Sequence, residues 1–157
     1  MQLKRPDLPM GGGCPCGAVR FEVTAMPLLI YACHCTECQQ WSGSAFSLSM
    51  PVAATAFGLL RGEPKPWRRI GNSGVQTTYW FCSDCGGRLY AEREEYPDIR
   101  TVRAGTLDDT SWVWPVAHAY MRSAQPWEQI TQTECFEVAP TDFRSLAARW
   151  QRMWQAE

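Results

Sequence analysis

Hydrophobic and polar residues alternate along several short stretches of the chain, which is the pattern of half-buried β-strands. Val19, Phe21 and Val23 alternate with polar residues, and a similar alternation runs from Phe46 to Met50. Other short stretches are apolar or rich in β-branched and aromatic residues, and they predict further strands at 28–32, 77–81, 88–91 and 99–103. Frequent turn residues separate these stretches, so the sequence predicts a mainly β fold.

Two segments depart from the strand pattern. Apolar residues recur at spacings of three and four over 143–154, which predicts one amphipathic helix over about 141–156 with Thr141 as its N-cap. Residues 58–74 are rich in glycine and proline, so they are predicted to form a loop or an irregular edge. That loop would be long enough to form a wall of a site.

Length and charge limit the classes of protein that fit this chain. Its 157 residues can bury a core without disulfides, so one domain is expected over 1–157, with a core at about 11–130. A net charge of -1 provides no basic field for nucleic acid. The sequence contains no uncharged apolar stretch of about 18 residues and no signal-like start. We expect a cytoplasmic protein that binds neither nucleic acid nor membrane; homodimer formation is left open.

Seven of the eight cysteines fall into three short clusters: Cys14 and Cys16; Cys33, Cys35 and Cys38; and Cys82 and Cys85. Cysteines one or two residues apart, in a chain without an export signal, are typical of metal ligands rather than disulfides. Seven such thiols predict two zinc ions, one held by four thiolates and one held by three.

The first and last clusters are alike, because each cysteine pair is followed by glycine and then by a strand-like segment. Gly17 and Gly86 would allow the tight backbone turn that a zinc knuckle needs. Two knuckles far apart in the sequence can share one tetrahedral ion that stabilises the fold. We therefore predict a structural zinc on Cys14, Cys16, Cys82 and Cys85.

The middle cluster would direct three sulfurs at a second ion from a strand end and the first turn of a short helix. A zinc ion with three protein ligands keeps a position for water or substrate, so a catalytic zinc is predicted on Cys33, Cys35 and Cys38. Three thiolates weaken the Lewis acidity of zinc but keep a bound thiolate reactive. This favours delivery of a nucleophile over strong polarisation of a carbonyl.

The fourth ligand of this second zinc is left open between water, an exogenous thiol, His34, His118 and Cys135. His34 lies between two ligands, so its side chain is expected to point away from the metal. His118 is more typical of a hydrogen-bonded strand histidine than of a ligand. Cys135 has no neighbouring thiol and is expected to be a small buried apolar residue.

Taken together, these motifs resemble the glutathione-dependent formaldehyde-activating enzyme (GFA) family. The resemblance runs in family order over about residues 11–130, through 13–21, 33–38 with Gly43, 81–86, 104–109, and His118 followed by Pro126-Trp127. It implies a β-tent, in which antiparallel sheets are clamped by a structural zinc, a fold shared with centromere protein V-like domains. It also implies the same partition of cysteines, with a second zinc that is lost or displaced when a thiol binds.

The resemblance further implies a carbon-sulfur lyase that forms or cleaves S-hydroxymethylglutathione or a similar thiol-aldehyde adduct. The expected partners are a small-molecule thiol and an aldehyde, with glutathione as co-substrate. Groups that could bind the co-substrate are Arg61, Arg68, Arg69, Arg103 and His118, although each arginine is also typical of a solvated surface. Asp108 and Asp109 are weaker candidates for proton transfer, because paired acids in a turn more often act as caps.

Other functions fit parts of the pattern. A related enzyme could act on another small molecule, or the chain could be a non-enzymatic zinc-stabilised binding module, in which case the three-cysteine cluster would hold no metal. A redox pair formed by Cys35 and Cys38 is a further alternative. Cys33 argues against it, because a third thiolate at metal spacing has no use in dithiol exchange.

Overall fold

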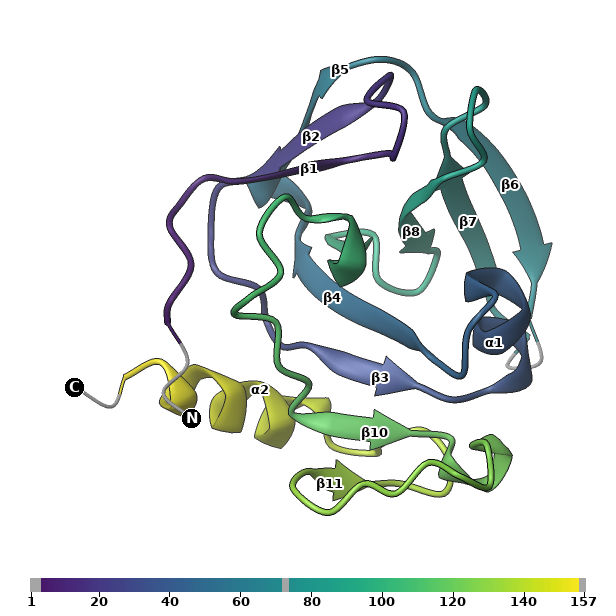
Figure 1. Cartoon of the computed structure of the whole chain (residues 1–157), viewed down its shortest axis with the longest axis vertical. Coiled ribbons are helices and arrows are strands. Elements are labelled where there is room, and N and C mark those ends of the chain that lie inside the picture. The colour runs from purple at the N-terminus through teal and green to yellow at the C-terminus, as the bar shows by residue number, and fades with distance from the viewer. Residues whose placement is uncertain (1–3, 72–73, 156–157) are drawn as a thin grey trace. The chain divides into compact units, whose positions relative to one another are not determined.

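The computed structural model describes residues 4–71 and 74–155, and over these residues the chain folds mainly as β-strands, as predicted (Figure 1). The described residues form eleven strands and two α-helices. The chain divides into two compact units: unit 1 is Met1–Pro27 with Pro51–Trp112, and unit 2 is Leu28–Met50 with Val113–Glu157. Among the described residues, no helix is both long and apolar enough to span a membrane.

Unit 1 contains a three-stranded antiparallel sheet in the order β1-β2-β5, formed by β1 (Met10–Gly13), β2 (Arg20–Val23) and β5 (Phe57–Arg61). The alternation predicted around Phe21 places Phe21 and Val23 in the core, both fully buried. Gly12 pairs with Phe21, and a Cβ on Gly12 would lie 2.4 Å from the Phe21 ring. The glycine therefore makes room for the buried aromatic ring.

A second antiparallel sheet in unit 1 has the order β6-β7-β8-β9. Its strands are β6 (Lys65–Ile70), β7 (Gln76–Phe81), β8 (Arg88–Arg93) and β9 (Ile99–Arg103). Two short 3-10 turns, Ala54–Ala56 and Ala104–Thr106, also lie in unit 1. The predicted strands at 77–81, 88–91 and 99–103 coincide with β7, β8 and β9.

Of the two alternatives predicted for 58–74, a loop or an irregular edge, the structure supports the edge, because the segment contains most of β5 and all of β6, and β6 lies at the edge of its sheet. Residues 72–73 of that prediction lie outside the described residues. β6 is an edge strand whose side chains are mostly exposed, so it lacks the alternation by which strands are recognised. Pro66 is tolerated there because an edge strand leaves one side of its backbone unpaired.

Unit 2 contains β3 (Tyr31–Cys33), the first part of β4 (Ser47–Ala53), β10 (Ala117–Ala119) and β11 (Glu134–Cys135). Their order is β4-β3-β10-β11. β3 and β4 are antiparallel, whereas β10 runs parallel to both β3 and β11. The sheet is therefore mixed, and α1 (Thr36–Ser42) and the 3-10 turn Met121–Ser123 follow β3 and β10.

The predicted amphipathic helix is present as α2 (Phe143–Met153). Its N-cap is Asp142 and not Thr141, since the Asp142 carboxylate accepts a hydrogen bond from the Ser145 N–H at 2.9 Å. Aspartate is the stronger N-cap residue, which explains the one-residue error. Leu146 and Trp150 are buried, so the apolar stripe is used for packing. The predicted helix end at residue 156 lies outside the described residues.

Candidate metal centres

Four cysteines come together in unit 1 from two turns. Cys14 and Cys16 follow β1, Cys82 and Cys85 follow β7, and all four Sγ atoms lie within 4.8 Å of one another. The Sγ atoms of Cys14 and Cys16 are 3.5 Å apart, and those of Cys16 and Cys82 are 3.8 Å apart. A tetrahedral zinc with bonds of about 2.3 Å holds its sulfurs about 3.8 Å apart, whereas a disulfide needs about 2 Å. The spacing fits zinc and excludes a disulfide.

The backbone of both turns explains why the thiols converge. Gly17 and Gly86 have φ values of 77° and 71°, in the left-handed region that glycine adopts without strain, as predicted. The Val19 N–H donates a hydrogen bond to the Cys14 sulfur at 3.2 Å. Burial opposes ionisation of Cys14, but this donor and the neighbouring thiols lower its pKa to about 6. A metal here would link the two sheets of unit 1.

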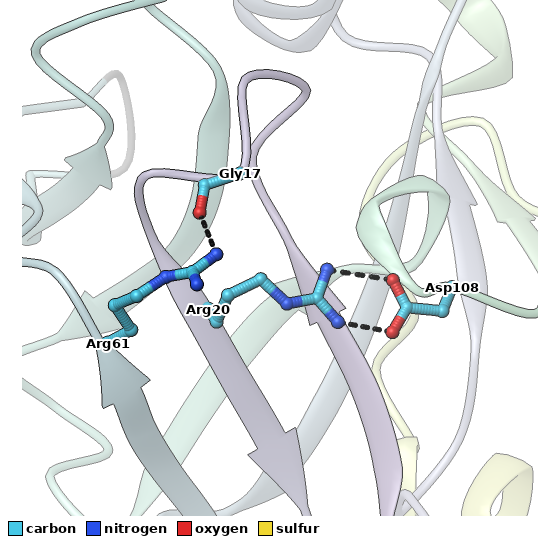
Figure 2. Close-up of polar contacts among 4 residues, drawn as sticks. All are labelled: Gly17, Arg20, Arg61 and Asp108. Atoms are coloured by element: carbon cyan, nitrogen blue, oxygen red, sulfur yellow. Dashed lines mark hydrogen bonds and ion pairs between the residues drawn. The ribbon is translucent and has the colours of Figure 1, made fainter.

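The carboxylates of Asp108 and Asp109 both accept hydrogen bonds from nearby residues. Arg20 on β2 donates two hydrogen bonds to the Asp108 carboxylate, one of them at 2.8 Å from Nη1 to Oδ1 (Figure 2). This bidentate contact with Arg20 lowers the pKa of Asp108. Asp109 accepts a hydrogen bond from the Ser111 N–H at 2.9 Å, as a turn cap does. These contacts support ion-pair and capping roles over proton transfer.

The four candidate arginines all lie in unit 1. Arg61 donates a hydrogen bond to the carbonyl of Gly17, in the turn of the first cysteine pair (Figure 2). The guanidinium of Arg69 lies over the Trp67 ring, 5.8 Å from its centroid. Arg68 is exposed on β6, and Arg103 ends β9. Arg61 thus contacts the turn that carries Cys14 and Cys16. Co-substrate binding by any of the four arginines stays a prediction.

Three cysteines come together in unit 2 around the start of α1. Cys33 ends β3 and is buried, Cys35 is the N-cap of α1, and Cys38 lies in the first turn of the helix. Their Sγ atoms lie within 4.8 Å of one another, and over residues 4–71 and 74–155 no further Cys, His, Asp or Glu completes the group. The Cys35 sulfur accepts the Cys38 N–H at 3.3 Å. The helix start therefore orients two of the three thiols.

The charges of these thiols depend on one another. Hydrogen bonds with Cys35 and Cys38, together with burial, raise the pKa of the Cys33 thiol. Hydrogen bonds with Cys33 and Cys38 lower the pKa of Cys35. One thiolate is therefore stabilised at the expense of its neighbours, and a divalent cation would allow all three to ionise. Three convergent sulfur donors fit a zinc ion.

His34 and His118 form a buried pair on the side of the sheet opposite Cys33. His118 pairs with Ala32 across the β10–β3 ladder, so His118, Ala32 and His34 share one face and Cys33 points to the other. The His34 Nε2 and His118 Nδ1 atoms are 2.9 Å apart. Burial, with a contribution from His34, lowers the pKa of His118 to about 4, so the ring is neutral at pH 7. Neither histidine belongs to the thiol cluster.

The expectation that Cys135 is buried was wrong. Cys135 is exposed on β11, and its thiol lies 3.7 Å from the Thr133 carbonyl. β11 is a two-residue edge strand, and both of its residues are exposed. The structure therefore does not bring Cys135 into the three-thiol group.

Gln39 connects α1 to the segment after β10, a role that the sequence did not reveal. Its Nε2 donates to the carbonyls of His34 and Ser123, each at 2.7 Å, and its Oε1 accepts from the Gln125 side chain at 2.8 Å. The first bond holds the backbone between Cys33 and Cys35, and the other two cross 84 and 86 residues of sequence. One amide thus positions the thiol loop.

Replacing Gln39 by alanine is expected to destabilise the protein by about 1–3 kcal/mol, since three hydrogen bonds are lost at a half-buried site. The control is Gln40→Ala, which removes the same side chain from an exposed position on the same helix and should change stability by less than about 0.5 kcal/mol. Urea unfolding of both variants measures the difference. Equal effects of the two substitutions would show that the Gln39 contacts contribute nothing.

The structure thus defines a mainly β protein with two thiol clusters at metal-ligand spacing, one of four sulfurs and one of three. The family model described as glutathione-dependent formaldehyde-activating enzyme matches residues 9–123, which include all seven clustered cysteines. The chain belongs to this family.

Two relatives place the match in context. A Sordaria macrospora protein, named after glutathione-dependent formaldehyde-activating enzymes, is 28% identical over 101 residues, which are 60% of this chain and 42% of that protein. The match therefore spans less than half of that relative. The crystal structure of a Rhodobacter sphaeroides protein matches with a TM-score of 0.52 and 23% identity, over 63% of this chain and 88% of that one. Structural similarity to the Rhodobacter sphaeroides protein supports the fold alone.

Proposed function

We propose that the chain is a carbon-sulfur lyase of the formaldehyde-activating type, which forms or cleaves S-hydroxymethylglutathione or a similar thiol-aldehyde adduct. Family membership supports the reaction class. The observation that carries the proposal is the difference between the clusters, four thiols in one and three in the other. Four thiolates close a zinc site, whereas three leave a position for a substrate.

The proposed reaction joins a thiol to formaldehyde without any oxidant or reductant. The thiol loses its proton, its sulfur forms a bond to the aldehyde carbon, and the carbonyl electron pair moves to oxygen, which then takes up a proton. The product is a hemithioacetal, and the reverse reaction breaks the same carbon-sulfur bond. Zinc at the second cluster, when bound, would lower the pKa of an incoming thiol.

The residues of this chain would hold and shape that site. Cys33, Cys35 and Cys38 would supply the three protein ligands, and Gln39 holds the backbone that carries them. The four-cysteine cluster would hold the other zinc as a structural ion that links the sheets of unit 1. Glutathione is the proposed thiol because the family description names it.

Exchange spectroscopy with ¹³C-formaldehyde tests this proposal, because it follows the interconversion of free and S-hydroxymethyl glutathione at equilibrium. The zinc-loaded protein is expected to raise the exchange rate in proportion to its concentration. The control is zinc chloride at the same metal concentration. An exchange rate no higher than that of the control would refute the reaction, and equal acceleration with 2-mercaptoethanol would refute a preference for glutathione.

A further inference from the structure

Unit 2 contains a cavity of about 350 Å³ whose lining residues belong to neither thiol cluster. Trp114 and Pro115 line it ahead of β10, His118 lines it from the strand itself, and the remaining lining is the loop 129–133. The volume lies at the lower end of the range for small-molecule sites. With His118 neutral, none of the lining side chains carries a charge at pH 7.

The loop 129–133 supplies five of the eight residues that line this cavity. Within the described part of the chain, none of its five N–H groups donates a hydrogen bond to another residue. Backbone N–H groups require partners, so these groups are available to water or to a ligand. An amide group carries both a donor and an acceptor, so it can form hydrogen bonds with the backbone of this loop in the way that an added β-strand does. The loop therefore favours a ligand with a peptide-like group.

The histidine pair determines which polar atom His118 presents. The Nδ1 atom of His118 is occupied by His34 Nε2 at 2.9 Å, which leaves Nε2 as the other ring nitrogen. If His34 donates in this contact, the neutral His118 ring accepts at Nδ1 and carries its own proton on Nε2; if His118 donates, it carries its proton on Nδ1. The Nε2–H form is the more stable tautomer of a free neutral histidine side chain, so the first arrangement is favoured. His118 then offers an N–H donor.

We propose that this cavity binds an uncharged ligand that carries an amide group, whose carbonyl oxygen accepts a hydrogen bond from the Nε2–H of His118. Its remaining polar groups pair with the backbone of 129–133, and Trp114 supplies an apolar wall. An anion is disfavoured because the lining contains no lysine or arginine that could pair with it. This proposal does not rest on the proposed reaction, because no lining residue belongs to a thiol cluster.

The test is an NMR titration of the zinc-loaded, ¹⁵N-labelled full chain with N-acetylglycinamide, without formaldehyde or thiol. Saturable shifts are expected at the amides of 129–133 and at the Trp114 indole. N-Acetylglycine, the carboxylate of the same shape, should bind at least tenfold more weakly. Diffuse shifts that do not saturate, or equal affinity for the acid, would overturn the proposal.

His118→Phe removes the donor but keeps a flat ring in the cavity, and it is expected to weaken N-acetylglycinamide binding about tenfold. Unchanged affinity in a folded His118→Phe protein would overturn the role of His118. A second measurement needs no variant: the side-chain ¹⁵N shifts of the two histidines report their tautomers directly. An Nδ1–H tautomer of His118 would contradict the inferred donor.

Discussion

The Cys82→Ser protein is expected to lose one zinc per chain and the folded structure of unit 1. Cys82 is 1% exposed and shares its cluster with three thiols that lie on turns of two different sheets. Binding of structural zinc contributes about 10–16 kcal/mol in zinc-finger peptides, which is comparable with the whole stability of a domain, about 5–15 kcal/mol. Native mass spectrometry would count the metal, and amide NMR spectra would show which residues lose dispersed signals.

Cys135→Ser is the matched control for this substitution. Cys135 is exposed and lies outside both clusters, so the same exchange of sulfur for oxygen should leave metal content and folding unchanged. If Cys82→Ser retained two zinc ions and native stability, the four-cysteine cluster could not be a structural metal site. If Cys135→Ser also lost metal, the assignment of the clusters would be wrong.

Local spacing allowed the thiol groups to be anticipated from the sequence. Cysteines one or two residues apart on a turn must point toward a common region, and Gly17 and Gly86 provide the left-handed backbone that such turns require. The two groups predicted from spacing are those whose sulfurs converge in the structure. Their role as zinc ligands stays a prediction.

Contacts between residues that are far apart in the sequence could not be predicted from it. Arg20 and Asp108 are separated by 88 positions, and His34 and His118 by 84. No local pattern distinguishes such residues from solvated polar side chains, because each partner comes from a segment that only the fold brings close. The register of β10 on β3 places His118 beside His34, and only the folded sheet reveals it.

Edge strands and exposed positions account for the remaining errors. A loop could not be distinguished from an edge strand at β6, because an edge strand exposed on both faces carries no two-residue alternation of apolar side chains. Cys135 was expected to be buried because cysteine commonly is, yet β11 is too short to bury it. In both cases the side-chain environment was set by the position of the strand in its sheet and not by residue type.

Replacing Cys35 by serine is expected to abolish thiol-dependent formaldehyde turnover while the fold is retained. Serine is itself a favourable N-cap, so the contact now made with the Cys38 N–H can be kept while the thiolate is lost. Changes in the residues that merely support metal ligands reduce activity about 10–100-fold, and loss of a ligand should cost at least 100-fold. Exchange spectroscopy and native mass spectrometry would measure turnover and zinc on the same sample.

The zinc content and turnover of the Cys35→Ser protein distinguish the proposed enzyme from a zinc-stabilised binding module. The enzyme requires two zinc ions in the native chain and one in the Cys35→Ser protein, with turnover lost and unit 1 unchanged. A binding module would contain one zinc in both proteins and accelerate exchange in neither. Turnover that persists in Cys35→Ser at the level of the Cys135→Ser control would place the reaction away from the cluster of Cys33, Cys35 and Cys38.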